Sequence, residues 1–215
     1  MTEKFLKLNP EKQKKILQAI CEEFTDHSYD EASTNRIVER AGISKGTLFN
    51  YFGCKEGMYH ALLNYVLDFF KNYAIDGFET DDFIERCRIL AEKDIEIYQE
   101  APYMINFFAT IYTADQSHIP TDITDAINIL LSEAMENLYT DLNYDLFRTD
   151  VDPTLLMRLI RFTFEGYMQE IMTQLKMGGL IADTFEAFMN DYRIILKEMK
   201  KIYYRKEVLA NVEEL

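Results

Sequence analysis

The sequence predicts an all-α fold in which an amino-terminal three-helix head, with a helix-turn-helix, precedes a larger helical domain. Apolar residues recur at spacings of three and four through most of the chain, as in amphipathic helices. Glycine (8) and proline (4) are scarce among the 215 residues, which argues against turn-rich β structure. We place the head at residues 1–54 and the larger domain at residues 55–215.

The first predicted helix begins at Asn9-Pro10 and runs to about Asp26. Asparagine is a favoured N-cap, and proline is well suited to the first helical position because it needs no N–H partner there. One stripe of this helix is apolar and is expected to face the core: Ile16, Leu17, Ile20 and Phe24.

Residues 33–55, STNRIVERAGISKGTLFNYFGCK, predict two short helices joined by a tight turn. Ser33 can cap the first helix and Ser44 the second. Gly42 can leave the first helix in a left-handed conformation without steric cost. Leu48 and Phe52, four residues apart, then point toward the core.

The second short helix keeps polar side chains away from that core. We expect Lys45, Thr47, Asn50 and Tyr51 on its other faces, where they can meet phosphates or base edges. This pattern favours a helix-turn-helix that binds DNA. The alternative is a helical hairpin that merely packs, since two short helices joined by glycine occur in many all-α domains.

These residues, with the helix before them, resemble the TetR family of bacterial transcriptional regulators. The resemblance covers residues 10–66 and runs through KKILQAICEEF, Tyr29, IVERAGISKGTLFNYF and Lys55-Glu56. The sequence departs from the family where Ser28, Val38 and Phe49 stand in place of the usual Gly, Ala and Tyr. Phe49 lacks the tyrosine hydroxyl that often meets a phosphate in this family, which puts one contact with the DNA backbone in doubt.

The resemblance implies that the partner is double-stranded operator DNA. The residues that we expect to contact it are Ser33, Thr34, Lys45, Gly46, Thr47, Asn50, Tyr51 and Lys55.

The formal net charge of −14 is unevenly distributed. Residues 1–55 hold nine Lys/Arg and eight Asp/Glu, whereas the rest of the chain holds fourteen and twenty-nine. The acidic part would repel DNA, which favours docking by the amino-terminal end. Five lysines near the first helix form either a solvated face or phosphate contacts: Lys4, Lys7, Lys12, Lys14 and Lys15.

The larger domain is predicted to contain six further helices. They cover about residues 55–73, 81–99, 103–112, a stretch from about 121 to near Tyr144, 153–176 and 182–204. Asp152-Pro153 repeats the cap-and-proline signal of Asn9-Pro10.

The last two helices carry more apolar surface than one partner can cover, which favours a second subunit. The family resemblance implies the same, because TetR-like proteins dimerise through their last two long helices. The expected homodimer interface contains Leu159, Phe162, Phe188, Tyr192, Ile195 and Met199.

Aromatic and methionine residues are the candidates for a ligand pocket, although each also fits an ordinary core. They are Tyr98, Tyr103, Met104, Phe107, Phe108, Tyr112, Phe164, Tyr167 and Met168. The resemblance implies a pocket in this domain for a small-molecule effector. We expect an apolar or aromatic effector, and the acidic charge of the domain adds the option of a cationic one.

Enzyme, metal and cofactor sites are not expected. His27, His60 and His118 have no partner at metal-ligand spacing and are interpreted as surface or boundary residues. No phosphate-binding loop or nucleophile motif is present. Three cysteines without disulfide spacing, and no long apolar segment, favour a cytoplasmic protein with no membrane contact.

The sequence therefore predicts a ligand-responsive, homodimeric transcriptional regulator, most often a repressor in this family. The alternative is an all-α carrier for hydrophobic small molecules without a DNA-regulatory role. The acidic charge and Phe49 are the features that support this alternative.

Overall fold

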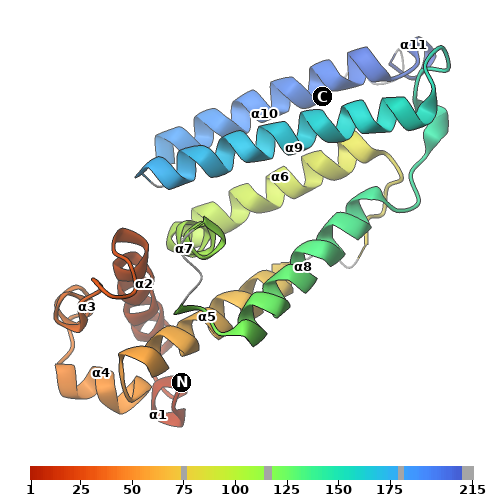
Figure 1. Cartoon of the computed structure of the whole chain (residues 1–215). Helices are drawn as coiled ribbons and strands as arrows, with labels where there is room; N and C mark the ends of the chain where they lie inside the picture. The colour runs from red at the N-terminus through yellow and green to blue at the C-terminus, as the bar shows by residue number, and fades with distance from the viewer. Residues whose placement is uncertain (74–76, 114–117, 179–181, 210–215) are drawn as a thin grey trace. The chain divides into compact units, whose positions relative to one another are not determined.

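The computed structural model describes residues 1–73, 77–113, 118–178 and 182–209. In these residues the regular structure is helical, apart from one isolated β-bridge between Phe147 and Tyr204 (Figure 1). The all-α prediction is confirmed. In chain order the helices are α1 (Glu3–Leu6), α2 (Pro10–Asp26), α3 (Thr34–Ala41), α4 (Lys45–Phe52), α5 (Lys55–Tyr73), α6 (Phe83–Glu100), α7 (Pro102–Thr113), α8 (Thr121–Tyr139), the 3₁₀ turn η2 (Tyr144–Leu146), α9 (Pro153–Gly178), α10 (Ala182–Tyr203) and α11 (Lys206–Leu209).

Most predicted helices are found within two residues of their expected ends. The Asn9 side chain accepts a hydrogen bond from the Lys12 N–H (3.1 Å), and the Asp152 side chain accepts one from Leu155 (2.9 Å). One prediction is corrected, because α8 ends at Tyr139 instead of near Tyr144. The short helices α1 and α11 were not expected.

The chain divides into two compact units, residues 1–74 with 97–131 and residues 75–96 with 132–215. The boundary that we place after residue 54 stays a prediction. In the first unit, α2 packs on α3, α5 and α7. Helix α4 contacts its two neighbours in the chain, α3 and α5. Fully buried side chains from four of these helices share one core: Ile16, Ile20, Ile37, Leu62 and Phe107.

The second unit is built around α9 and α10, which lie side by side (Figure 1). The Tyr167 ring stacks on Tyr192 with ring centres 4.9 Å apart, and its hydroxyl donates to the Phe188 carbonyl (2.6 Å). The start of α6 joins this core through Phe83, whose ring lies 6.2 Å from that of Phe164. These contacts explain why Phe164, Tyr167 and Tyr192 are buried.

Arg86 determines where α8 ends. Its buried guanidinium donates hydrogen bonds to the carbonyls of Asn137 (2.9 Å) and Thr140 (2.6 Å), and its Nε donates to Thr80 (2.7 Å). The last carbonyls of a helix lack partners within the helix, and a cation there also matches the helix dipole. Asp141 then takes a left-handed conformation (φ 53°), so the helix cannot continue.

Every helix among the described residues is too short or too polar to cross a membrane. The same part of the chain contains no cluster of His, Cys, Asp and Glu that could hold a metal ion.

Candidate nucleic-acid interface

Helix α3 ends in the turn that the sequence predicts. Gly42 adopts a left-handed conformation (φ 67°, ψ 38°). Its N–H donates to the Glu39 carbonyl, and the N–H of Ile43 donates to Val38 (3.1 Å). These two bonds form a Schellman motif, which satisfies the carbonyls at the end of α3 and turns the chain toward α4.

A buried carboxylate fixes the other end of α3. Glu23, from α2, is fully buried and accepts hydrogen bonds from the Ser33 N–H (2.7 Å) and from Arg36 (Nη2, 2.6 Å). Burial alone would raise the pKa of Glu23, but the hydrogen bonds from Arg36 and Ser33 outweigh it and lower that pKa. Ser33 is the N-cap residue of α3, but its hydroxyl accepts no hydrogen bond from the backbone N–H groups of the first turn.

Helix α4 is held in place by its cap and by its apolar face. The Ser44 side chain accepts the Thr47 N–H (3.1 Å), and Leu48 and Phe52 are buried. Lys45 and Gly46 are exposed. The polar face of α4 is therefore fixed before any partner binds.

Three polar side chains on α4, those of Lys45, Thr47 and Asn50, lie within hydrogen-bond distance of neighbouring side chains. The Lys45 ammonium donates to the Asn35 side chain (3.0 Å). The hydroxyls of Thr47 and Ser44 lie 2.8 Å apart. The exposed Asn50 side chain accepts a hydrogen bond from Lys4 (3.1 Å). Ser33 and Thr34 are half-buried at the start of α3.

Tyr51 requires a correction, because its ring does not lie on an outer face of α4. It is 8% exposed and packs edge-on against Phe5, with ring centres 5.7 Å apart. The unpredicted helix α1 causes this burial.

Helix α1 is anchored on α4 by three contacts. Phe5 is fully buried against Tyr51 and Phe52. The Thr2 N–H donates to the Tyr51 carbonyl (3.1 Å), and Lys4 reaches Asn50. The one signal in the sequence was an aromatic residue, Phe5, inside a lysine-rich run, but four residues are too few for a periodic pattern.

Lys55 begins α5, and its ammonium donates to the carbonyl of Asp30 (3.1 Å). The same ammonium lies 5.1 Å from the centre of the Tyr29 ring. Two residues later, a Cβ at Gly57 would come within 2.6 Å of the Phe52 carbonyl oxygen. Glycine at this position is what lets α5 start so close to the end of α4.

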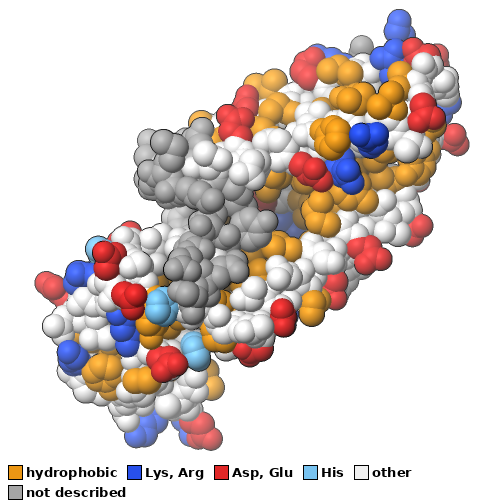
Figure 2. Space-filling view, viewed as in Figure 1, with side chains coloured by type: hydrophobic (Ala, Val, Ile, Leu, Met, Phe, Trp, Pro, Cys, Tyr) orange, Lys and Arg blue, Asp and Glu red, His pale blue; other side chains and the backbone are white. Residues whose placement is uncertain are grey.

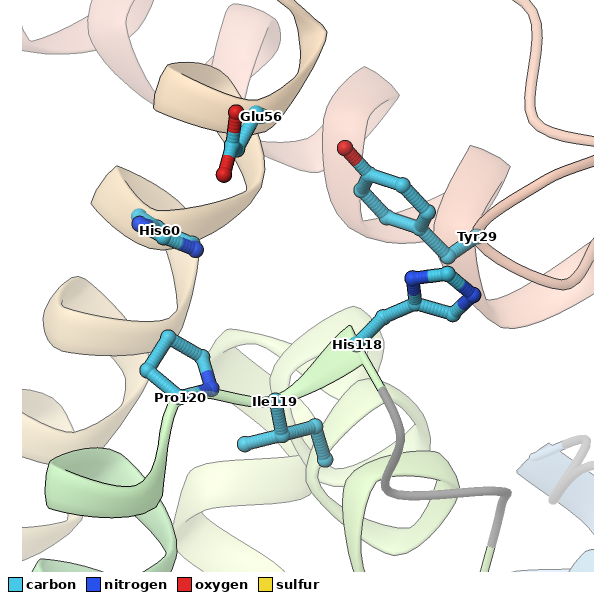
Figure 3. A pocket seen from close by; sticks show the side chains of 6 residues that line it. All are labelled: Tyr29, Glu56, His60, His118, Ile119 and Pro120. Carbon is cyan, nitrogen blue, oxygen red and sulfur yellow. The ribbon is translucent and has the colours of Figure 1, made fainter.

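A hollow of about 340 Å³ opens beside Tyr29 in the first unit. Figure 3 shows its lining: Tyr29, Glu56, His60, His118, Ile119 and Pro120. The His118 ring stacks on Tyr29 (4.6 Å), and its Nε2 lies 3.3 Å from a carboxylate oxygen of Asp30. The sequence suggested surface or boundary positions for His60 and His118 and gave no sign that they converge.

The structure does not gather the predicted ligand-binding residues into one unit. Tyr98, Tyr103, Met104, Phe107 and Phe108 belong to the first unit, and Phe164, Tyr167 and Met168 to the second. Tyr103, Met104 and Phe107 are buried in the shared core with α2, so the interpretation as ordinary core holds for these three. The side chain of Tyr112 lies outside the described residues.

The predicted dimer residues also separate into two groups. Leu159 (42% exposed) and Phe162 (51%) are at the surface, and Phe188 and Ile195 are half-buried. Tyr192 and Met199 are buried within their own chain, which corrects their placement at an interface. Three further apolar residues of α9 and α10 are exposed: Leu155, Ile194 and Ile202.

The geometry defines an all-α protein with an amino-terminal helix-turn-helix whose second helix presents a polar face. Residues 16–62 match the family model described as "Bacterial regulatory proteins, tetR family". Over residues 16–62 this match supports the resemblance to the TetR family that the sequence predicted.

A relative is the HTH-type transcriptional regulator BetI 1 of Chromohalobacter salexigens, which is 32% identical over 62 residues. The match covers 29% of this chain and 31% of that protein's length.

Solved structures resemble the chain over most of its length. A TetR family transcriptional regulator from Chloroflexus aurantiacus has a TM-score of 0.57 at 21% identity, with 95% of this chain and 99% of that one covered. The transcriptional regulator FadR from Bacillus subtilis, solved in complex with stearoyl-CoA, has a TM-score of 0.50 at 18% identity, with 85% and 96% covered. At these identities the likeness shows the fold.

Proposed function

We propose that the chain is a homodimeric transcriptional repressor that binds double-stranded operator DNA through α4 and is released by a small-molecule effector. The observation that carries this proposal is the polar face of α4, which the Ser44 cap and the buried Leu48 and Phe52 hold in position. A preformed face loses little conformational freedom on binding. The match of residues 16–62 to the TetR family model supports the proposal.

Base reading is assigned to Asn50 and Thr47, with Lys45 on base edges or phosphates. An asparagine amide matches the hydrogen-bonding edge of adenine in the major groove. Gly46 is exposed, and an added Cβ would meet only the Ser44 hydroxyl at 3.9 Å. Glycine there leaves room for the DNA backbone to approach.

Phosphate contacts are assigned to Ser33, Thr34 and Lys55. Lys55 must exchange the Asp30 carbonyl for a phosphate oxygen when DNA binds. Its charge would then contribute through counterion release.

Lys4 joins the proposed interface on structural grounds. Because its ammonium donates to the Asn50 side chain, it orients the amide that reads the base. The burial of Phe5 holds α1, and therefore Lys4, beside α4.

The second subunit is proposed to cover the exposed apolar residues of α9 and α10. Figure 2 shows hydrophobic side chains at the surface over these helices. Leu159, Phe162, Ile194 and Ile202 are 42–60% exposed, and large exposed apolar groups side by side mark interaction surfaces. Two heads of such a dimer would read half-sites about 34–36 Å apart.

The effector is proposed to be apolar or aromatic and to bind in the larger domain. Phe164, Tyr167 and Met168 on α9 are the candidates that share one helix face. The complex of FadR with stearoyl-CoA supports an apolar ligand by analogy of fold. In one conformation of such a dimer the two heads are spaced so that they cannot reach both major grooves. An effector that binds this conformation with higher affinity releases the DNA. A repressor of this kind is expected in the cytoplasm, where the DNA lies.

The deciding experiment is a gel-shift assay with the DNA upstream of the protein's own gene, at stated salt concentrations. Lys55→Ala should weaken binding to every sequence and reduce the salt slope by about one. Asn50→Ala should relax the preference at one base pair, at a cost of about 1–3 kcal/mol. Lys71→Ala, which removes an exposed lysine outside the interface, is the control.

The carrier of hydrophobic small molecules is the second candidate, and the acidic composition favours it. If the parent protein shifts no upstream DNA but binds a fluorescent fatty acid, the repressor proposal fails and the carrier is favoured. Sedimentation of the parent as a monomer at micromolar concentration would refute the dimer.

A further inference from the structure

We propose that the hollow beside Tyr29 is a second ligand site, for a small organic molecule that carries a primary ammonium group and a hydroxyl. Its volume of about 340 Å³ lies at the lower end of the range of ligand pockets and has room for a small metabolite. The lining residues that the structure describes all belong to the first unit, whereas the apolar candidates on α9 belong to the second.

The ammonium is assigned to Glu56. Its exposed carboxylate lines the hollow from the first turn of α5 and has no hydrogen bond or ion pair within the described residues. The neighbouring cation does not neutralise it, because the Lys55 ammonium is hydrogen-bonded to the Asp30 carbonyl. A carboxylate without a partner binds an ammonium through a charge-assisted hydrogen bond.

The hydroxyl is assigned to His60 and Tyr29. His60 follows Glu56 by four residues on α5, so both side chains lie on the same face of the helix. Figure 3 shows the His60 imidazole facing the hollow and the Tyr29 hydroxyl directed toward Glu56. A neutral imidazole and a phenol each donate and accept hydrogen bonds, which suits a hydroxyl group.

The remaining wall is apolar or already paired. Pro120 offers apolar surface for a short alkyl chain, and the buried Ile119 supports the wall from the core. His118 is held against Tyr29 and Asp30, so it shapes the hollow without competing for the ammonium. Convergent polar groups on one side and apolar groups on the other are typical of a small-molecule site.

Binding here has a direct route to the DNA-contacting surface. Tyr29 supports the Lys55 ammonium at 5.1 Å, and Glu56 is the next residue in the chain. A ligand that engages Tyr29 and Glu56 changes the surroundings of Lys55 and hence its contact with phosphate. This consequence rests on the proposed function, whereas the binding itself does not.

The binding test uses three probes that differ mainly in charge: 4-aminobutan-1-ol, 1,4-butanediol and 4-hydroxybutanoate. Each is titrated at one fixed pH into the full-length protein, and the imidazole NMR signals are followed. The amine should shift the signals of His60 and His118, while His27, which does not line the hollow, stays unchanged. Equal shifts with the diol, or no shift at tens of millimolar amine, would overturn the proposal.

The matched variants are Glu56→Gln and Glu11→Gln, which remove the same charge from exposed positions inside and outside the hollow. Glu56→Gln should weaken amine binding at least tenfold, and Glu11→Gln should leave it unchanged. If Glu56→Gln binds the amine with unaltered affinity, the assignment of the ammonium to Glu56 is wrong and the proposed site is refuted. His60→Asn serves as a second variant, with a smaller loss expected.

The gel-shift assay then tests the coupling. The amine should change the operator affinity of the parent but not that of Glu56→Gln. If the NMR shifts appear and the affinity stays constant, the route through Lys55 is wrong while the site stands. If the parent binds no operator, the proposed function fails, and the NMR result still decides the ligand site.

Discussion

Glu23 in the first unit and Arg86 in the second are buried charges that secure opposite ends of helices. Glu23 accepts the N–H that opens α3, and Arg86 donates to the carbonyls that close α8. Each charge has the sign that the helix dipole favours at its end. Both units thus use one long charged side chain to satisfy a helix end that water reaches poorly.

The two sites differ in what neutralises the charge. Glu23 is ion-paired with Arg36 at 2.6 Å. Arg86 forms no ion pair within the described residues and meets carbonyls and the Phe78 ring, whose centre lies 5.1 Å away. The helix end next to the proposed DNA-contacting surface therefore depends on a group that titrates, whereas the end of α8 depends on one that stays charged at every physiological pH.

The largest expected effect is that of Arg86→Met. The change leaves several carbonyls at the end of α8 without donors, and each buried acceptor left unpaired costs about 1–3 kcal/mol. We expect a loss of roughly 3–5 kcal/mol in the free energy of unfolding, measured by urea denaturation. A loss below 1 kcal/mol would show that water replaces the guanidinium.

Glu23→Gln should have a smaller effect, because glutamine keeps one acceptor for the Ser33 N–H. It loses the charge and turns an amide toward Arg36, so we expect a destabilisation of about 1–3 kcal/mol at neutral pH. Urea denaturation at pH 7 measures it. The exposed Glu11→Gln is the control and should change stability little.

The ion pair of Glu23 with Arg36 also predicts how the free energy of unfolding depends on pH. Because the pKa of Glu23 is lowered in the folded state from its ordinary value of 4.5, its contribution is complete above that value. It is lost as the pH falls below 4.5 and through the folded-state pKa. The stability gap between the parent and Glu23→Gln should therefore shrink in acid, and a gap that is constant down to pH 2 would contradict the assignment.

Phe78→Leu should give the smallest effect. Leucine keeps apolar contact with Arg86 but removes the ring face, at a cost of about 0.5–1 kcal/mol. A double-mutant cycle with Arg86→Met isolates the pair, because the second change should cost nothing once the guanidinium is gone. An undiminished cost in the Arg86→Met background would assign the effect to packing alone.

The sequence predicts best where local rules decide the outcome. The caps at Asn9, Ser44 and Asp152, and the left-handed Gly42, occur where the residue types require them. The end of α8 was predicted wrongly because it is set by Arg86, more than fifty residues earlier in the chain.

The candidate sites show the same limit. Phe5 and Tyr51 bury each other across 46 residues of sequence, so no window of the sequence could reveal that Tyr51 faces inward. Tyr192 has the spacing of an exposed seam, but the same spacing serves contact with Tyr167 in its own chain. The hollow joins Glu56 and His118 from separate elements, which periodicity cannot bring together.

The chain's three cysteines have unequal access to solvent. Cys54, between α4 and α5, is exposed, whereas Cys21 and Cys87 are buried. Burial raises the pKa of both buried thiols, that of Cys87 to about 12, so few thiolates form there. A maleimide spin label should therefore attach at one position in each subunit. In a dimer, pulsed electron paramagnetic resonance between two such labels would read the separation of the heads as a length, with and without effector.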